Sequence, residues 1–73
     1  FVFGEVKNPG AYPIRTGTTV LQALSLAGGL TPAAARGRVK VVRLVNGQKL
    51  EITVKLDDVV RPGDTVTVPE RYF

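Results

Sequence analysis

Four basic side chains near the middle of the sequence are its strongest candidates for recognising a ligand: Arg36, Arg38, Lys40 and Arg43. Arginine binds a carboxylate through two parallel hydrogen bonds, so this cluster could contact an acidic polysaccharide. It could equally contact acidic residues of a neighbouring subunit. A solvated surface is the third interpretation, and it is the commonest outcome for exposed charge. All three remain open from the sequence.

The few aromatic residues are the second set of candidates. Sugar rings often stack on aromatic faces, which draws attention to Tyr12 and Tyr72. Phe1 and Phe3 alternate with Val2, so one or both face outward if the valine faces the core. An exposed aromatic pair indicates a contact surface. We expect it to pack against an adjacent domain or subunit.

The residues needed for catalysis and for metal binding are scarce. The sequence has no histidine and no cysteine, the commonest general base and the thiol nucleophile. Ser25 is the only serine, and the adjacent Asp57 and Asp58 are typical of a turn or a helix start. We expect Asp64 to bind backbone amides of a turn. The sequence therefore predicts a non-enzymatic protein with no catalytic residues, no metal site and no cofactor.

Length and charge limit the class of protein further. The 73 residues are enough for one domain, residues 1–73, and we expect it to be excised from a larger protein. The net charge of +4 is a mild excess, so nucleic acid is not an expected partner. The sequence has no apolar run of membrane-spanning length, and we expect no membrane contact by this segment.

The first part of the chain reads as a hairpin followed by a helix. Residues 1–7 and 11–15 predict two strands, the second at an edge because Pro13 lacks an N–H. The Asn8-Pro9-Gly10 motif between them predicts a type II turn with a positive φ at Gly10. Residues 19–27 predict a helix capped by Thr19 and Gln22.

The glycines after this helix are expected to end it. Phosphate-binding loops place glycines before a helix, whereas Gly28 and Gly29 follow one. Further along, residues 39–45 and 48–56 predict a hairpin closed by Asn46-Gly47, although the register of residues 39–45 stays open. Arg61-Pro62-Gly63-Asp64 predicts a tight turn before a fifth strand, residues 65–69.

This order of elements predicts an α+β fold of the β-grasp type, a ubiquitin-like roll. One helix would cover one face of a mixed sheet of about five strands. The expected core consists of Val2, Val6, Ile14, Val20, Leu21, Leu24, Ala27, Leu50, Ile52, Val54, Val66 and Val68, with Leu30 and some of Val39, Val41 and Leu44.

Three segments carry a resemblance to a known family. Residues 2–12 (VFGEVKNPGAY), residues 19–31 with their double glycine, and residues 61–69 (RPGDTVTVP) resemble the soluble-ligand-binding β-grasp (SLBB) domain. The ending of the chain, residues 68–73, is most similar to outer-membrane polysaccharide export proteins. The resemblance implies tandem domains in the periplasmic part of a homo-oligomeric, ring-forming lipoprotein that exports capsular or extracellular polysaccharide. It carries no catalytic set.

Two other functions remain open at this point. SLBB domains also occur in DNA-uptake competence proteins, and the positive charge would suit that setting. A receptor for a small ligand is the third hypothesis, although no concave constellation of aromatic or polar residues can be recognised in the sequence.

Overall fold

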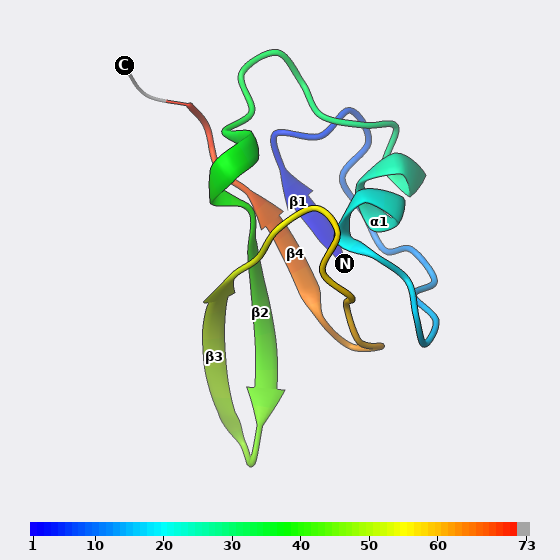
Figure 1. Cartoon of the computed structure of the whole chain (residues 1–73), viewed down its shortest axis with the longest axis vertical. Helices are drawn as coiled ribbons and strands as arrows, with labels where there is room; N and C mark the ends of the chain where they lie inside the picture. The colour runs from blue at the N-terminus through cyan, green and yellow to red at the C-terminus, as the bar shows by residue number, and fades with distance from the viewer. Residues whose placement is uncertain (72–73) are drawn as a thin grey trace.

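The apolar segments of the chain pair into one mixed sheet, and an amphipathic segment forms a helix on one side of it (Figure 1). A computed structural model describes residues 1–71. Its sheet contains β1 (Val2–Gly4), β2 (Lys40–Val45), β3 (Gln48–Thr53) and β4 (Thr65–Val68), in the order β1-β4-β2-β3. β1 and β4 are parallel, whereas β2 is antiparallel to β3 and to β4. The α+β, β-grasp-like fold is confirmed, but the described residues form four strands instead of about five.

The missing strand is the segment 11–15, for which the prediction was wrong. The chain pairs with β1 just before this segment, where Gly10 and Val2 exchange backbone hydrogen bonds of 2.8 and 2.9 Å. Pro13 has no N–H with which to continue a ladder. The Arg15 N–H bonds to the Thr18 hydroxyl oxygen (3.1 Å) instead of to a strand. Pairing with the edge strand β1 therefore ends at Gly10, and residues 11–15 form a loop.

The Asn8-Pro9-Gly10 motif does not form the predicted type II turn. Gly10 lacks the positive φ that the third position of this turn requires, and the nearest positive φ belongs to Gly4 (93°). The N–H of Asn8 bonds to the carbonyl of Ala27 (2.8 Å), at the end of the helix. A long-range hydrogen bond has thus replaced the local turn.

Helix α1 (Val20–Leu26) begins and ends where the sequence predicts. The Thr19 hydroxyl accepts the Gln22 N–H (3.1 Å), and the Gln22 side chain accepts the Thr19 N–H (2.9 Å), which completes a capping box. At the other end, Gly28 and Gly29 both have positive φ and donate their N–H groups to carbonyls of the last turn. This arrangement is a Schellman stop, and a short 3₁₀ helix, η1 (Arg36–Arg38), later leads into β2.

The β2–β3 hairpin is longer than the strand it packs beside. Asn46 (φ 50°) and Gly47 (φ 79°) have the two positive φ angles of a type I′ turn, as expected. β4 pairs only with residues 40–42 of β2, so the hairpin projects beyond β4 (Figure 1). Leu50 lies opposite Arg43 in this projecting part. It is 44% exposed, so its placement in the core was wrong.

The core lies between α1 and one face of the sheet. Val2, Val66 and Val41 form a row across β1, β4 and β2 on this face, and each is completely buried. A buried side chain of this size contributes roughly 1.5–3 kcal/mol. The buried apolar cluster consists of Val2, Val6, Val20, Ala23, Leu24, Ala27, Ala34, Val39, Val41, Val60, Val66 and Val68, with Ile14, Leu30, Val54 and Leu56 packed at its margin.

Two further leucines of the expected core face solvent. Leu21 is 54% exposed, because the inward stripe of α1 runs through Val20, Ala23 and Leu24 and leaves Leu21 on the outer side. Leu44 is 67% exposed in the projecting hairpin. Sequence reasoning also missed Val60, which is buried although it lies in a connection between strands.

Candidate binding surfaces

A tight turn before β4 places a buried carboxylate beside the hairpin. The Asp64 N–H bonds to the Arg61 carbonyl (3.0 Å), Pro62 occupies the second position, and Gly63 has a φ of 91°, as a type II turn requires. The Asp64 carboxylate accepts the Arg61 N–H at 2.9 Å through Oδ2, the role predicted for it. Its side chain is only 3% exposed.

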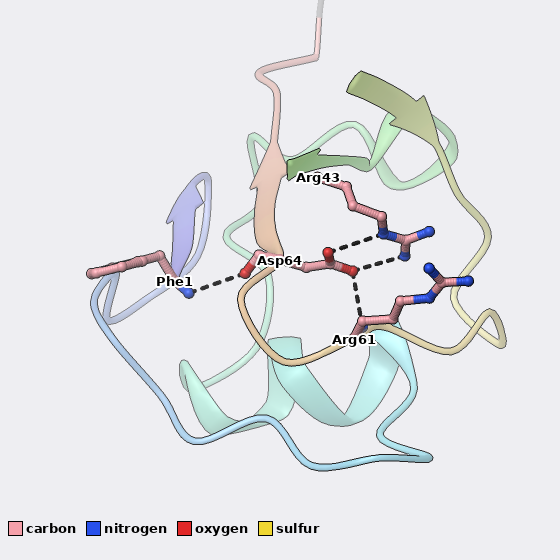
Figure 2. A network of polar contacts seen from close by, with 4 residues as sticks. All are labelled: Phe1, Arg43, Arg61 and Asp64. Atoms are coloured by element: carbon pink, nitrogen blue, oxygen red, sulfur yellow. Dashed lines mark hydrogen bonds and ion pairs between the residues drawn. The ribbon is translucent and has the colours of Figure 1, made fainter. Parts of the chain in front are cut away.

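The same carboxylate binds Arg43 of β2, which the sequence did not indicate (Figure 2). Arg43 Nε donates to Oδ1 (3.0 Å) and Nη2 donates to Oδ2 (2.8 Å), a bidentate pair. Burial alone would raise the pKa of Asp64, but the hydrogen bonds from Arg43 and from the Arg61 backbone outweigh burial and lower this pKa. The hydrogen bond to Asp64 in turn raises the pKa of Arg43. This pair therefore stays ionised and ties the hairpin to the turn.

The other members of the predicted basic cluster have different surroundings. Arg36 and Arg38 are exposed in η1, before the sheet begins. Lys40 forms an ion pair with Glu51 of β3 (2.9 Å), with both side chains substantially exposed. Alternation along β2 puts Lys40 and Arg43 on opposite faces of the sheet. The four basic residues are therefore distributed over separate surfaces, and their contact with a ligand or subunit stays a prediction.

The face of the sheet opposite α1 carries the aromatic pair. Phe1 and Phe3 are 56% and 44% exposed, and their rings stack with centroids 5.7 Å apart and planes 9° apart. The outward orientation expected for these residues is confirmed. The Phe1 backbone nitrogen also donates to the Asp64 carbonyl oxygen (3.3 Å), as Figure 2 shows. The stacked rings are a candidate contact surface, which we call the aromatic pair.

The two tyrosines differ in how much can be said of them. Tyr12 is half-buried, packs against the core, and donates its hydroxyl to the Asn8 carbonyl oxygen. The ring therefore holds the loop that precedes it, and stacking on a sugar stays a prediction. Tyr72 lies outside the described residues.

The outer side of α1 is an apolar surface that sequence reasoning missed. Leu21 and Leu26 are 54% and 47% exposed and line a shallow hollow with Thr18, Gln22 and Ser25. The signal was present in the sequence, because a helix with five apolar residues in seven cannot bury all of them on one side. We call Leu21 and Leu26 the outer helix pair.

The remaining candidates for chemistry have structural partners. The Ser25 hydroxyl donates to the Leu21 carbonyl (2.9 Å), and the Asp58 carboxylate accepts the Lys55 N–H (2.8 Å) in a turn. Residues 1–71 contain no group of three acidic, histidine or cysteine side chains placed to bind a metal. In the same part of the chain, no helix combines the length and apolarity needed to cross a membrane.

Comparison with known families agrees with this geometry. The family model of the SLBB domain matches residues 1–53. The chain belongs to the SLBB family. SLBB domains are binding modules and not a family of enzymes, and no curated protein matches this SLBB domain. The turn at residues 61–64 lies beyond the matched residues.

Proposed function

We propose that this SLBB domain is a non-catalytic interaction and assembly module of a polysaccharide export protein. It would act in the periplasm, in a homo-oligomer associated with the outer membrane. Family membership supports a binding role. The likeness of the ending, residues 68–73, to export proteins supports the setting. The observation that carries the assembly role is apolar surface on both outer sides of the domain.

The first apolar surface is the aromatic pair on the open face of the sheet. Phe1 and Phe3 are each about half exposed, although theirs are the largest purely apolar side chains of the described residues. Covering them with a partner surface removes apolar area from water at roughly 25 cal/mol per Å². A neighbouring copy or a neighbouring domain of the same protein would gain this contribution.

The second apolar surface is the outer helix pair. Val20 and Leu24 of α1 face the core, so Leu21 and Leu26 lie on the side of the domain opposite the aromatic pair. Contact between the helix side of one copy and the sheet side of the next is heterologous. Heterologous contacts close into rings when the rotation between copies permits. This arrangement supports a ring of SLBB domains.

The non-catalytic part of the proposal is supported by the side chains themselves. The 73 residues contain no histidine or cysteine. The Ser25 hydroxyl and the Asp58 carboxylate are engaged with backbone groups. The Asp64 carboxylate is engaged with Arg43 and the Arg61 backbone.

The test uses the full-length protein in cells that export polymer through it. Phe3→Ser and Leu21→Ser each remove one apolar surface without entering the core. We expect each variant to lose crosslinked oligomers and at least tenfold of exported polymer, at unchanged protein level. Thr53→Ser, at an exposed position of β3 in the same row as Phe3, is the matched control and should export normally. Normal assembly and export by both test variants would contradict the proposal.

A further inference from the structure

A cavity of about 530 Å³ lies between the projecting hairpin and the turn before β4. Its walls are residues 43–46 on one side and residues 61–64 on the other. It exists because β4 begins at Thr65 while β2 continues to Val45, so the end of β2 has no strand beside it on that edge. The cavity is thus a consequence of unequal strand lengths.

The charges in this cavity do not balance. Asp64 is its one carboxylate, and two guanidinium groups, those of Arg43 and Arg61, line the same space. Asp64 Oδ1 accepts Arg43 Nε, and Oδ2 accepts both Arg43 Nη2 and the Arg61 backbone N–H. Among the described residues, the guanidinium of Arg61 makes no hydrogen bond, and it acts on Asp64 only through its charge. A net positive charge therefore remains at the cavity wall.

The two arginines also have a suitable arrangement for a common ligand. Figure 2 shows their side chains extending to the same side of Asp64. Arg43 is fixed by its bidentate pair and is only 19% exposed, yet its Nη1 group is not used by Asp64. Arg61 is exposed and retains all its side-chain donors. A planar guanidinium offers paired donors that match a carboxylate.

The rest of the lining indicates what the carboxylate would be attached to. Leu44 and Pro62 offer apolar surface, and the Asn46 side chain offers an amide donor and acceptor. A pyranose ring presents C–H groups on its faces and hydroxyl groups at its edge, so it matches this combination. A volume of about 530 Å³ lies within the range of small-molecule sites.

We propose that this cavity, which we call the Arg43–Arg61 cavity, binds the carboxylate of an acidic sugar. Arg61 would bind the carboxylate directly, and Asp64 would hold Arg43 in place as the second donor. This inference deepens the proposed function, on which its biological meaning rests, by naming the class of polymer: one that contains uronic acid. The sequence-based candidates Arg36 and Arg38 are not part of this site.

The test is a titration of the ¹⁵N-labelled chain with digalacturonate at low salt, followed by amide chemical shifts. We expect shifts confined to the amides of residues 43–46, 61, 63 and 64, with a dissociation constant on the order of 1 mM. Lactose, a neutral disaccharide, should produce no shifts at equal concentration. The absence of shifts with digalacturonate, or equal shifts with lactose, would overturn the proposal.

Two arginine variants test whether Arg61 in particular, rather than net charge, binds the sugar. Arg61→Gln retains the backbone N–H that caps Asp64 and should weaken digalacturonate binding at least tenfold. Arg36→Gln removes the same charge at an exposed position in η1 and should change binding less than twofold. Equal losses in both variants would mean that net charge alone binds the sugar and would overturn the site. Unchanged melting temperatures would show that both variants are folded.

A titration with inorganic phosphate distinguishes general anion binding from specific binding of an acidic sugar. We expect phosphate to bind at least tenfold more weakly than digalacturonate, because it cannot use the apolar wall. Equal or tighter phosphate binding at these residues would overturn the assignment to an acidic sugar. Binding by the isolated chain is measured independently of assembly in cells. Failure of this titration therefore leaves the assembly proposal standing, and failed assembly leaves the cavity result standing.

Discussion

The two faces of the sheet come from the same short strands but differ in burial. On the face toward α1, Val2, Val66 and Val41 are completely buried in one row. On the other face, the neighbouring row contains Phe3, which is 44% exposed, and Lys40, whose side chain is 44% exposed. Small valines thus hold the domain together, while the larger ring remains in water. The buried row on the helix side and the exposed row on the opposite side are separate sets of residues, so a change in the exposed row should affect stability less than a change in the buried row.

The largest expected loss of stability comes from the core between α1 and the sheet. Leu24→Ala removes a side chain that is 1% exposed and should lower the free energy of unfolding by about 3 kcal/mol. A domain this small has a margin of only a few kcal/mol, so the variant should be largely unfolded near 37 °C. Leu21→Ala in the same helix is the matched control, with an expected loss of about 0.5 kcal/mol or less. Urea unfolding measures both, and equal losses would contradict the separation of the two sides of α1.

Loss of the Arg43–Asp64 ion pair, at the end of the face that packs against α1, should give the second-largest loss of stability. Asp64→Asn leaves the Arg43 guanidinium without its carboxylate and should destabilise the domain by about 2 kcal/mol, because a nearly buried pair is broken. The neutral side chain keeps a carbonyl oxygen for the Arg61 N–H, so the turn itself should persist.

The same pair predicts a dependence of stability on pH. The pKa of Asp64 is lower in the folded chain than in the unfolded chain, so the unfolded state binds more protons as the pH falls below about 4. This contribution is complete above that pH and is lost as the pH falls through the folded pKa. Urea midpoints from pH 6 to pH 2 should therefore fall for the wild type, and less for Asp64→Asn. Asp57→Asn, at an exposed aspartate, should retain the wild-type fall; an identical acid response of Asp64→Asn and wild type would contradict this role.

Substitutions on the face that carries Phe3 should lower the stability less. Phe3→Thr keeps a strand-forming residue and removes one ring of the aromatic pair, with an expected loss of about 1 kcal/mol or less, the usual value of an aromatic pair. Thermal unfolding checks the value. A loss as large as that of Leu24→Ala would show that Phe3 supports the core and would weaken the division between the faces.

The smallest effect is expected at the Lys40–Glu51 pair. Both side chains are substantially exposed, so a double-mutant cycle with Lys40→Ala and Glu51→Ala should give a coupling of about 0.5 kcal/mol or less. The coupling should decline further in 1 M NaCl, because salt screens exposed charges. A coupling above about 1 kcal/mol that survives in salt would indicate that the face with Phe3 and Lys40 is less solvated than the face comparison predicts.

Local features of the fold could be predicted from the sequence because their physics involves near neighbours. Thr19 and Gln22 cap the helix within one turn, and Gly28 ends it because glycine tolerates a positive φ. The Asn46-Gly47 turn and the turn that ends at Asp64 follow the same logic. Alternation also predicted the outward orientation of Phe3.

The tertiary structure decided which side chains are buried, because burial depends on how far the neighbouring strands and the helix extend. Alternation along β3 places Leu50 on the same face as Ile52, but it cannot show that β4 and α1 stop short of Leu50. Residues 11–15 form no strand because the pairing with β1 ends at Gly10, another outcome that the local pattern does not reveal. Arg43 and Asp64 are separated by 21 positions, and only the adjacency of β2 and β4 brings them together. The Arg43–Arg61 cavity follows from that adjacency and from unequal strand lengths, neither of which a single sequence encodes in its local pattern.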